Sequence, residues 1–357
     1  MATPALDSDL DAWRLPAEWE PHQATWIGWP DDLPARAGRS APMRQVCAEV
    51  VKTVADGEQV RILVSSKEQE AKARRLLRTL GADSERVAFH RWPTDRGWTR
   101  HIGPICVLRG QTHAETAVAR FRFNAWARHP DYRKDDQIAE RAARALALKL
   151  RRVVHGGRPV VLEGGAVEVD GRGTLLATEE CLLDPFVQVR NPGFRREDYQ
   201  QVFLDAFGAR HTIWLGKGIA GDEAHGHVDK LCRFVRPGTI VLCSEPNGDD
   251  VNHRPLAENR ERLQEARLAN GSKPEIVALP MPAPIVVDGQ RLAASYAGFY
   301  VADAAVLVPT FDDPNDRLAL GTLGELFTGR PVVPVRALDL LRGPGSPHGL
   351  TQQQPKA

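Results

Sequence analysis

Imidazole and carboxylate side chains recur in short motifs of this sequence, where they could carry out acid–base chemistry. His227 and Asp229 lie two residues apart in Gly-His-Val-Asp, and on a strand this spacing would place both side chains on one face. Glu163 precedes a Gly-Gly pair, and His101 ends the motif Trp98-Thr-Arg-His. Histidine can move protons near neutral pH, and a nearby carboxylate can orient the ring or its substrate. These residue types therefore predict proton transfer on a bound small molecule.

The same imidazole groups could instead bind a divalent transition metal. Imidazole nitrogens and carboxylate oxygens are common ligands of Zn²⁺ and related ions. The candidate ligands are His101, His225 and His227. A histidine that activates water without a metal is the alternative, and the residue types leave both open.

Composition narrows the classes of partner. The chain has 357 residues, of which 42% are hydrophobic and 26% charged, as in ordinary globular proteins. A net charge of +1 gives no overall field that would recruit nucleic acid or an anionic membrane. No apolar run approaches the roughly 18 residues of a membrane span, and the N-terminus lacks the pattern of a secretory signal. We therefore expect a cytoplasmic protein with a small-molecule substrate or ligand.

The cysteines give no sign of a disulfide framework or a zinc site. There are five, at positions 47, 106, 181, 232 and 243, and none forms a C-x-x-C pair. Free cysteine is among the most buried residue types. We expect most of the five to be small packing residues.

Short apolar strands alternate with helical segments along the whole sequence, which predicts one α/β domain over residues 1–357 built from repeated strand–strand–helix–strand units. Residues 1–12 and 352–357 are expected to be frayed ends. Helical periodicity predicts helices at 67–80, 136–151, 196–207, 255–270 and 316–327. Strands are predicted at 59–65, 105–108, 152–154, 160–162, 166–169, 174–177, 212–215, 239–243, 276–279, 285–287, 299–301, 305–309 and 332–335. Neither of the usual glycine-rich nucleotide motifs occurs.

Several multi-residue blocks, all in one order, resemble agmatine deiminases and the bacterial-type peptidylarginine deiminases. The blocks are Leu15–Pro30, Trp98–Pro104, Phe123–Trp126, Leu162–Gly165, Gly171–Leu183, Gly221–Asp229, Ala294–Tyr300 and the closing Thr-Gln-Gln. The resemblance implies the pentein fold, an α/β propeller of five ββαβ units around a pseudo-fivefold axis with the active site in its central channel. It also implies a homo-oligomer that needs no cofactor.

The resemblance further implies a chemistry in which a cysteine thiolate attacks a guanidinium carbon, a histidine moves protons and carboxylates hold the cation. On that basis His227 is the proton carrier, and Asp229 and Glu163 are the retained acids. His101 stands where the family has a second cation-holding aspartate, and Gly349 stands where it has the nucleophilic cysteine.

These two replacements argue against ordinary agmatine hydrolysis. Glycine cannot form a covalent adduct, and losing one partner of a buried charge pair costs about 2–5 kcal/mol. An aspartate often found upstream in the family is replaced by Arg96, which adds positive charge. The residues expected to line or support the channel are Trp29, Arg96, Trp98, Arg100, Glu223, His225, His348 and Gly349. Trp98 could equally be a packing residue, and Arg100 suits a structural pair with a channel carboxylate.

Three functions follow from this pattern. The first is a repurposed enzyme, a hydrolase or lyase that acts on a C–N bond of a guanidine-, amidine- or amide-like substrate without a cysteine adduct. The second is a non-catalytic pseudoenzyme or ligand-binding protein that keeps the channel. The third is residual agmatine deiminase activity through an unexpected nucleophile.

Overall fold

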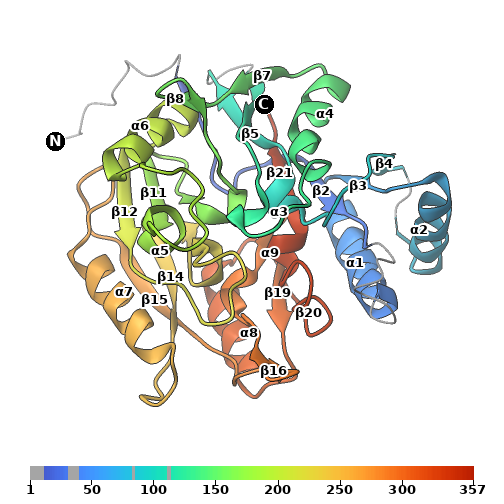
Figure 1. Cartoon of the computed structure of the whole chain (residues 1–357). Coiled ribbons are helices and arrows are strands. Elements are labelled where there is room, and N and C mark those ends of the chain that lie inside the picture. Colours follow the sequence, from blue (N-terminus) through green and yellow to red (C-terminus); the bar gives the residue numbers. More distant parts are fainter. Residues whose placement is uncertain (1–11, 31–39, 83–84, 111–113) are drawn as a thin grey trace.

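The computed structural model describes residues 12–30, 40–82, 85–110 and 114–357 (Figure 1). The α-helices within these residues are α1 (Ser40–Ala55), α2 (Lys67–Thr79), α3 (Thr99–Ile102), α4 (Ile138–Ala145), α5 (Glu179–Leu183), α6 (Arg196–Phe207), α7 (His253–Glu265), α8 (Asn315–Leu326) and α9 (Pro347–Leu350). The strands of the first half are β1 (Trp13–Arg14), β2 (His22–Gly28), β3 (Gln59–Leu63), β4 (Val87–His90), β5 (Ile105–Arg109), β6 (Glu115–Arg120), β7 (Lys149–Arg152), β8 (Val154–His155), β9 (Arg158–Pro159), β10 (Glu168–Val169) and β11 (Thr174–Thr178). Those of the second half are β12 (His211–Leu215), β13 (Cys232–Arg236), β14 (Thr239–Ser244), β15 (Glu275–Pro280), β16 (Val286–Val287), β17 (Gln290–Arg291), β18 (Tyr300–Val301), β19 (Val306–Thr310), β20 (Val332–Arg336) and β21 (Thr351–Pro355).

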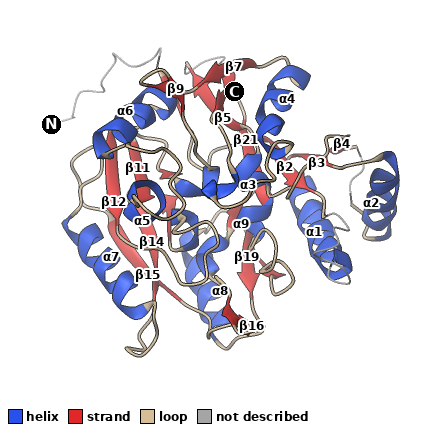
Figure 2. Cartoon of the chain, in the orientation of Figure 1, coloured by secondary structure: helices blue, strands red, loops and turns tan. Residues whose placement is uncertain are grey.

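One strand pattern repeats through the larger sheets, in which an antiparallel pair is followed by a parallel partner. The three-stranded sheets are β10-β11-β12, β13-β14-β15 and β18-β19-β20. The four-stranded sheets β1-β5-β6-β7 and β21-β2-β3-β4 contain the same pattern. Figure 1 shows these sheets surrounding the short helices α3 and α9, and Figure 2 shows α4, α6 and α7 on the outside of the strands. The repeat thus places α3 and α9 at the centre of the molecule.

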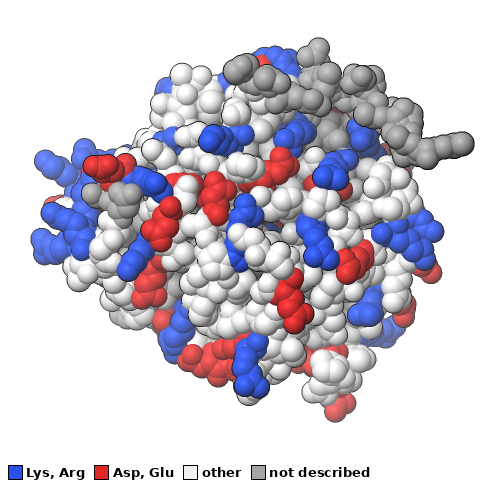
Figure 3. Space-filling view, turned by 180° about the vertical axis from the view of Figure 1, so that it is seen from behind, with Lys and Arg blue, Asp and Glu red and all other residues white. Residues whose placement is uncertain are grey.

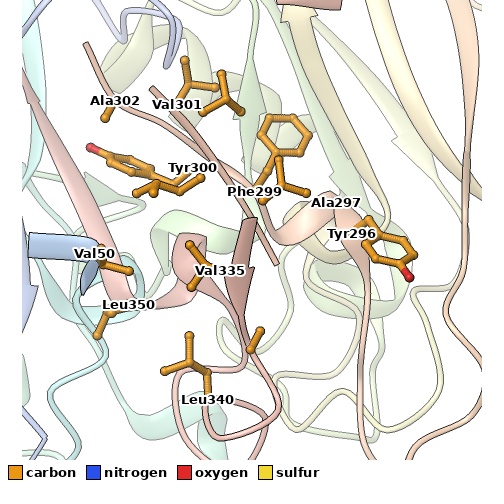
Figure 4. Close-up of a cluster of buried hydrophobic side chains, with 14 of the residues drawn as sticks. Val50, Tyr296, Ala297, Phe299, Tyr300, Val301, Ala302, Val335, Leu340 and Leu350 are labelled. Carbon is orange, nitrogen blue, oxygen red and sulfur yellow. The ribbon is translucent and has the colours of Figure 1, made fainter. Parts of the chain in front are cut away.

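The apolar core lies between the strands and the outer helices. Figure 4 shows part of its largest cluster, in which the labelled side chains are all buried: Val50, Tyr296, Ala297, Phe299, Tyr300, Val301, Ala302, Val335, Leu340 and Leu350. Leu350 is the last residue of α9 and is 1% exposed. Its burial anchors the segment that carries His348 and Gly349.

Two sequence predictions of secondary structure were wrong. The helix expected over 136–151 covers only Ile138–Ala145, because Lys149–Arg152 pairs in parallel with β6. Residues 160–162 form no strand, and Val161 makes only an isolated bridge to Arg122. In both places a pairing with a distant segment decides the local structure.

The prediction of a frayed end at 352–357 was also wrong. Gln352 and Gln354 are 3% and 6% exposed, and β21 pairs antiparallel with β2 from Ile27↔Thr351 to His22↔Pro355. The prediction for residues 1–11 lies outside the described residues. The pairing of β21 holds α9, which directly precedes it, against the centre of the fold.

On the face shown in Figure 3, basic and acidic side chains are interspersed. Among the described residues, no helix is both long and apolar enough to cross a membrane.

Candidate active site

Short segments between the sheets bring the predicted catalytic residues together. His101 lies on α3, Glu163 directly precedes the 3₁₀ turn Gly164–Ala166, and His227 directly precedes the 3₁₀ turn Val228–Lys230. The expected strand at His227 and Asp229 is therefore absent, and the two side chains share a turn instead. These turns pack against one another and against α3, which itself packs against α9. All four predicted catalytic side chains are buried, His101 being 6% and His227 0% exposed.

An ion-paired triad lies at the centre of the site. His227 Nε2 is 3.1 Å from Glu163 Oε2, and the Arg190 Nε lies 3.4 Å from both oxygens of the same carboxylate. Burial opposes ionisation of Glu163, but Arg190 and His227 lower its pKa to about 2. Arg190 was missed by the sequence analysis, because nothing in its local pattern distinguishes it from the surface arginines around it.

His227 is held as an imidazolium cation. Burial alone would lower its pKa, but the neighbouring Cys181 sulfur and the Glu163 carboxylate raise it from 6.5 to about 10. A raised pKa in the folded state stabilises the fold fully below the unfolded value and loses that contribution as the pH rises through the folded value. The ring is thus a proton donor at neutral pH.

This charge state predicts the pH dependence of stability. The free energy of unfolding of the native chain should fall, relative to that of a His227→Gln variant, as the pH rises from about 6.5 to about 10. Urea unfolding of both proteins at a series of pH values measures the difference. A difference that stays constant across this window would contradict the assignment of His227 as a cation.

A second buried network holds Asp229. Asp229 Oδ2 lies 2.7 Å from His348 Nδ1, and His348 Nε2 lies 2.9 Å from Glu18 Oε2. Glu18 also accepts hydrogen bonds from Arg100 at 3.0 Å and from Arg233 at 2.9 Å. Arg100 is therefore a structural partner of a buried carboxylate, as the sequence suggested. Glu18 and Arg233 were missed, since a buried arginine and a surface arginine give the same sequence signal.

Two polar atoms of this centre are buried without a hydrogen-bond partner among the described residues, His227 Nδ1 and Asp229 Oδ1. Gly165 packs tightly against the same two residues, because a Cβ atom there would lie 2.7 Å from His227 Nδ1 and from Asp229 Oδ2. Burying an ionised donor and an acceptor without partners is costly. A water molecule or a ligand group is expected to bind to each of them.

His101 lies directly on His227, with ring centroids 4.9 Å apart and the rings 28° from parallel. Trp126 donates its indole N–H to His101 Nδ1 at 3.1 Å. Burial, followed by the positive charge of His227, lowers the pKa of His101 well below its ordinary value. One imidazole of this stacked pair is therefore neutral while the other is charged.

Backbone atoms of a neighbouring turn fill the space beside Gly349 that a side chain would occupy. A Cβ atom at this position would lie 1.9 Å from the carbonyl oxygen of Pro344, far closer than van der Waals contact allows. Hydrogen bonds from the backbone N–H groups of Gly343 and Gly345 to the carbonyl of Leu340 hold this turn in place. The space that a side chain would need at Gly349 is thus filled by the turn 343–345.

A cavity of about 620 Å³ opens above His101. Trp98, His101 and Lys230 line it, together with the turn 343–345, and Glu223 and Arg128 are exposed residues that also line it. The cavity lining does not include His227 or Asp229, and the His227 ring stacks on that of His101. Lys230, which follows the His-Val-Asp motif directly, was not recognised in the sequence.

Three of the predicted binding residues lie elsewhere. Trp29 is 4% exposed within the core. Arg96 pairs with Asp131 at 2.8 Å, so its charge is neutralised away from the cavity. His225 lies 3.0 Å from Asp184, and it does not line the cavity.

The described residues offer little support for the predicted metal ligands, because His225 is separate from the stacked pair. Candidate ligand atoms of Glu163, Cys181 and His227 do lie within 4.8 Å of one another. However, the Arg190 guanidinium already occupies the Glu163 carboxylate, and a second cation there would be repelled.

The position of Cys181 is a correction to the sequence analysis, which treated it as a packing residue without a role near the site. Its sulfur lies beside His227 and Glu163. The side chain is buried in the core cluster that includes Tyr199 and Trp214, and it does not line the 620 Å³ cavity. The thiol therefore contacts the proton-carrying histidine but is not exposed to a ligand in that cavity.

The sheet pattern and the buried histidine–carboxylate centre define a deiminase-type protein of the pentein fold. A family model described as Porphyromonas-type peptidyl-arginine deiminase matches residues 14–355, and the chain belongs to this family. It is 32% identical over 378 residues to the agmatine deiminase of Pseudomonas aeruginosa strain LESB58, with 99% of each protein covered. The identity to the agmatine deiminase of Ectopseudomonas mendocina is also 32%, with the same coverage. A solved structure of the Enterococcus faecalis agmatine deiminase is similar at a TM-score of 0.85 and 27% identity, covering 99% of this chain and 100% of that one.

Proposed function

We propose that this chain acts on a C–N bond of a small, nitrogen-rich substrate without forming a cysteine adduct. The observation that carries the proposal is the pair of unpartnered buried atoms, His227 Nδ1 and Asp229 Oδ1, beside Gly165. Burying an ionised donor and an acceptor without hydrogen-bond partners is costly, so we infer that a ligand forms hydrogen bonds with them. Strongly opposed protonation states in neighbouring groups, here His101 and His227, are also typical of acid–base sites.

Water is the nucleophile in this proposal. Its oxygen forms a bond to the substrate carbon, the C–N bond breaks, and the leaving nitrogen takes the proton of His227. The proton lost by the attacking water then restores the imidazolium. Asp229 orients the substrate through its free oxygen, and the turn 343–345 has to move so that the substrate can pass from the cavity to this pair.

A second candidate function, a non-catalytic ligand-binding protein, is favoured by the closure around Gly349. The carbonyl of Pro344 occupies the space of a side chain there, and His227 is fully buried behind His101. If the turn 343–345 stays closed, a ligand reaches His101 but not His227.

Ammonia release from a panel of guanidine, amidine, amide and ureido compounds tests the two candidates. We expect turnover by the native chain and a loss of about 100-fold or more in His227→Gln. Cys181→Ala should keep turnover, with its alkaline limit moved to lower pH, because the sulfur helps to raise the pKa of His227. A covalent substrate adduct on Cys181, detected by mass spectrometry, would instead identify the buried thiol as an unexpected nucleophile. Binding without turnover of any member of the panel would favour the ligand-binding protein.

A further inference from the structure

The floor of the cavity presents N–H groups rather than carboxylates. An indole nitrogen only donates, so the bond from Trp126 requires His101 Nδ1 to be an acceptor. The proton of the neutral ring is therefore on Nε2. No hydrogen bond from this nitrogen is formed within the described part of the chain, and His101 is one of the residues that line the cavity.

Lys230 adds a second donor to the same floor. Its ammonium group binds Asp222, which is also a cavity residue. That carboxylate additionally accepts backbone N–H groups from Ala224, Gly226 and His227 at 2.9–3.0 Å. Asp222 is thus fully engaged by its own chain, and it is not free to hold a cationic ligand.

Most of the charged side chains at the cavity have ion-pair partners. Lys230 pairs with Asp222, and His227, beneath the floor, pairs with Glu163. Higher in the cavity, two arginines each have a carboxylate partner, with pairs Arg342–Asp288 at 2.7 Å and Arg291–Asp250 at 2.8 Å. Arg128 and Glu223, which also line the cavity, carry opposite charges. The positive side chains that line the cavity are thus balanced by Asp222, Glu223, Asp288 and the neighbouring Asp250, so the cavity has no large excess charge that would select an ionic reacting group.

We propose that this cavity recognises the uncharged carbonyl group of a ureido or amide compound rather than a guanidinium. This inference rests on the proposed function and names its class of substrate. A carbonyl oxygen can accept from His101 Nε2–H and from Lys230, whereas a guanidinium has five donors and no acceptor. A guanidinium carries only donors, so it cannot form hydrogen bonds with these N–H groups. Its positive charge would also lie near the cations Lys230 and His227.

Matched pairs of ligands test the inference by isothermal titration calorimetry. Agmatine and N-carbamoylputrescine share one tail and differ only in the imino nitrogen or carbonyl oxygen, as do arginine and citrulline. We expect the ureido member of at least one pair to bind at least about tenfold more tightly, the effect of roughly one hydrogen bond. A third pair, 5-aminovaleramide and 5-aminovalerate, separates an uncharged carbonyl from a carboxylate, and the amide is expected to bind more tightly.

Two variants examine the donors themselves. His101→Asp should shift the preference toward the guanidino member of each pair by about tenfold or more, since it replaces a donor by an acceptor. Trp126→Phe removes the bond that fixes the proton on Nε2, so the ratio of the two affinities should fall toward one. If His101→Asp does not fold, Lys230→Met tests the second donor, and it should weaken ureido binding more than agmatine binding.

The inference is overturned by tighter binding of the guanidino members, by tighter binding of the carboxylate, or by no binding of any ligand in the three pairs. Failure of the proposed function is a different result. Ureido binding without ammonia release would contradict hydrolysis but support the carbonyl preference, whereas turnover of guanidines alone would support hydrolysis and overturn the preference.

Discussion

Gly349→Cys is expected to destabilise the fold and to leave agmatine unhydrolysed, alone or together with His101→Asp. The new Cβ atom would overlap the Pro344 carbonyl oxygen at 1.9 Å. Backbone cannot rotate away as a side chain can, so the turn would have to move and lose its hydrogen bonds to Leu340. Overpacking of this kind costs about 1–3 kcal/mol, and the lost bonds add to it. Urea unfolding should therefore show a loss of about 2 kcal/mol or more.

Gly324→Cys is the matched control, because a Cβ atom at Gly324 on α8 meets no atom within 4 Å. That variant should retain the native free energy of unfolding to within about 0.5 kcal/mol. A Gly349→Cys protein of native stability that releases ammonia from agmatine would show that the turn opens readily. A single substitution would then be enough to give the chain agmatine hydrolysis.

Arg233→Met is expected to give the largest loss of stability among the variants considered. Arg233 is fully buried and donates to Glu168 and Glu18, each at 2.9 Å, and to the carbonyl of Phe299 at 2.8 Å. Its removal leaves buried acceptors without a cation, which typically costs about 3–5 kcal/mol. The Asp229–His348–Glu18 network should also loosen, so ligand binding should weaken together with stability.

Arg236→Met on the same strand is the control. Arg236 is exposed and pairs with Glu275 at 3.1 Å, and such surface pairs contribute about 0–1 kcal/mol. Urea unfolding of both variants compares two arginines three residues apart on β13. Equal effects would contradict the buried network as a source of stability.

The sequence predicted the elements whose pattern is local. The helix predicted at 196–207 is confirmed by α6, and the strand predicted at 174–177 is confirmed by β11. The family and the pentein fold followed from several ordered motifs, and His101, Glu163, His227 and Asp229 do converge. The predicted helix also extended wrongly over residues 149–151, where pairing with β6 prevails.

The features of the site that sequence could not predict depend on contacts between distant segments. Cys181 comes to lie beside His227, and Arg190 lies on Glu163. The carbonyl of Pro344 reaches the space beside Gly349 through a turn whose conformation no residue pattern specified. Glu18 is joined to Arg233 and His348 only after the fold has closed. In each case burial and a distant partner determine the charge and the role of the residue.

The pairing of β21 with β2 has a consequence for the order of folding. The two strands are separated by most of the chain, so their contact closes a very long loop and is expected to form slowly. His348 and Gly349 lie immediately before β21 and depend on that closure for their place at the centre. A folding intermediate with its outer sheets complete would therefore lack a finished ligand site, and ligand binding would report only the last step of folding.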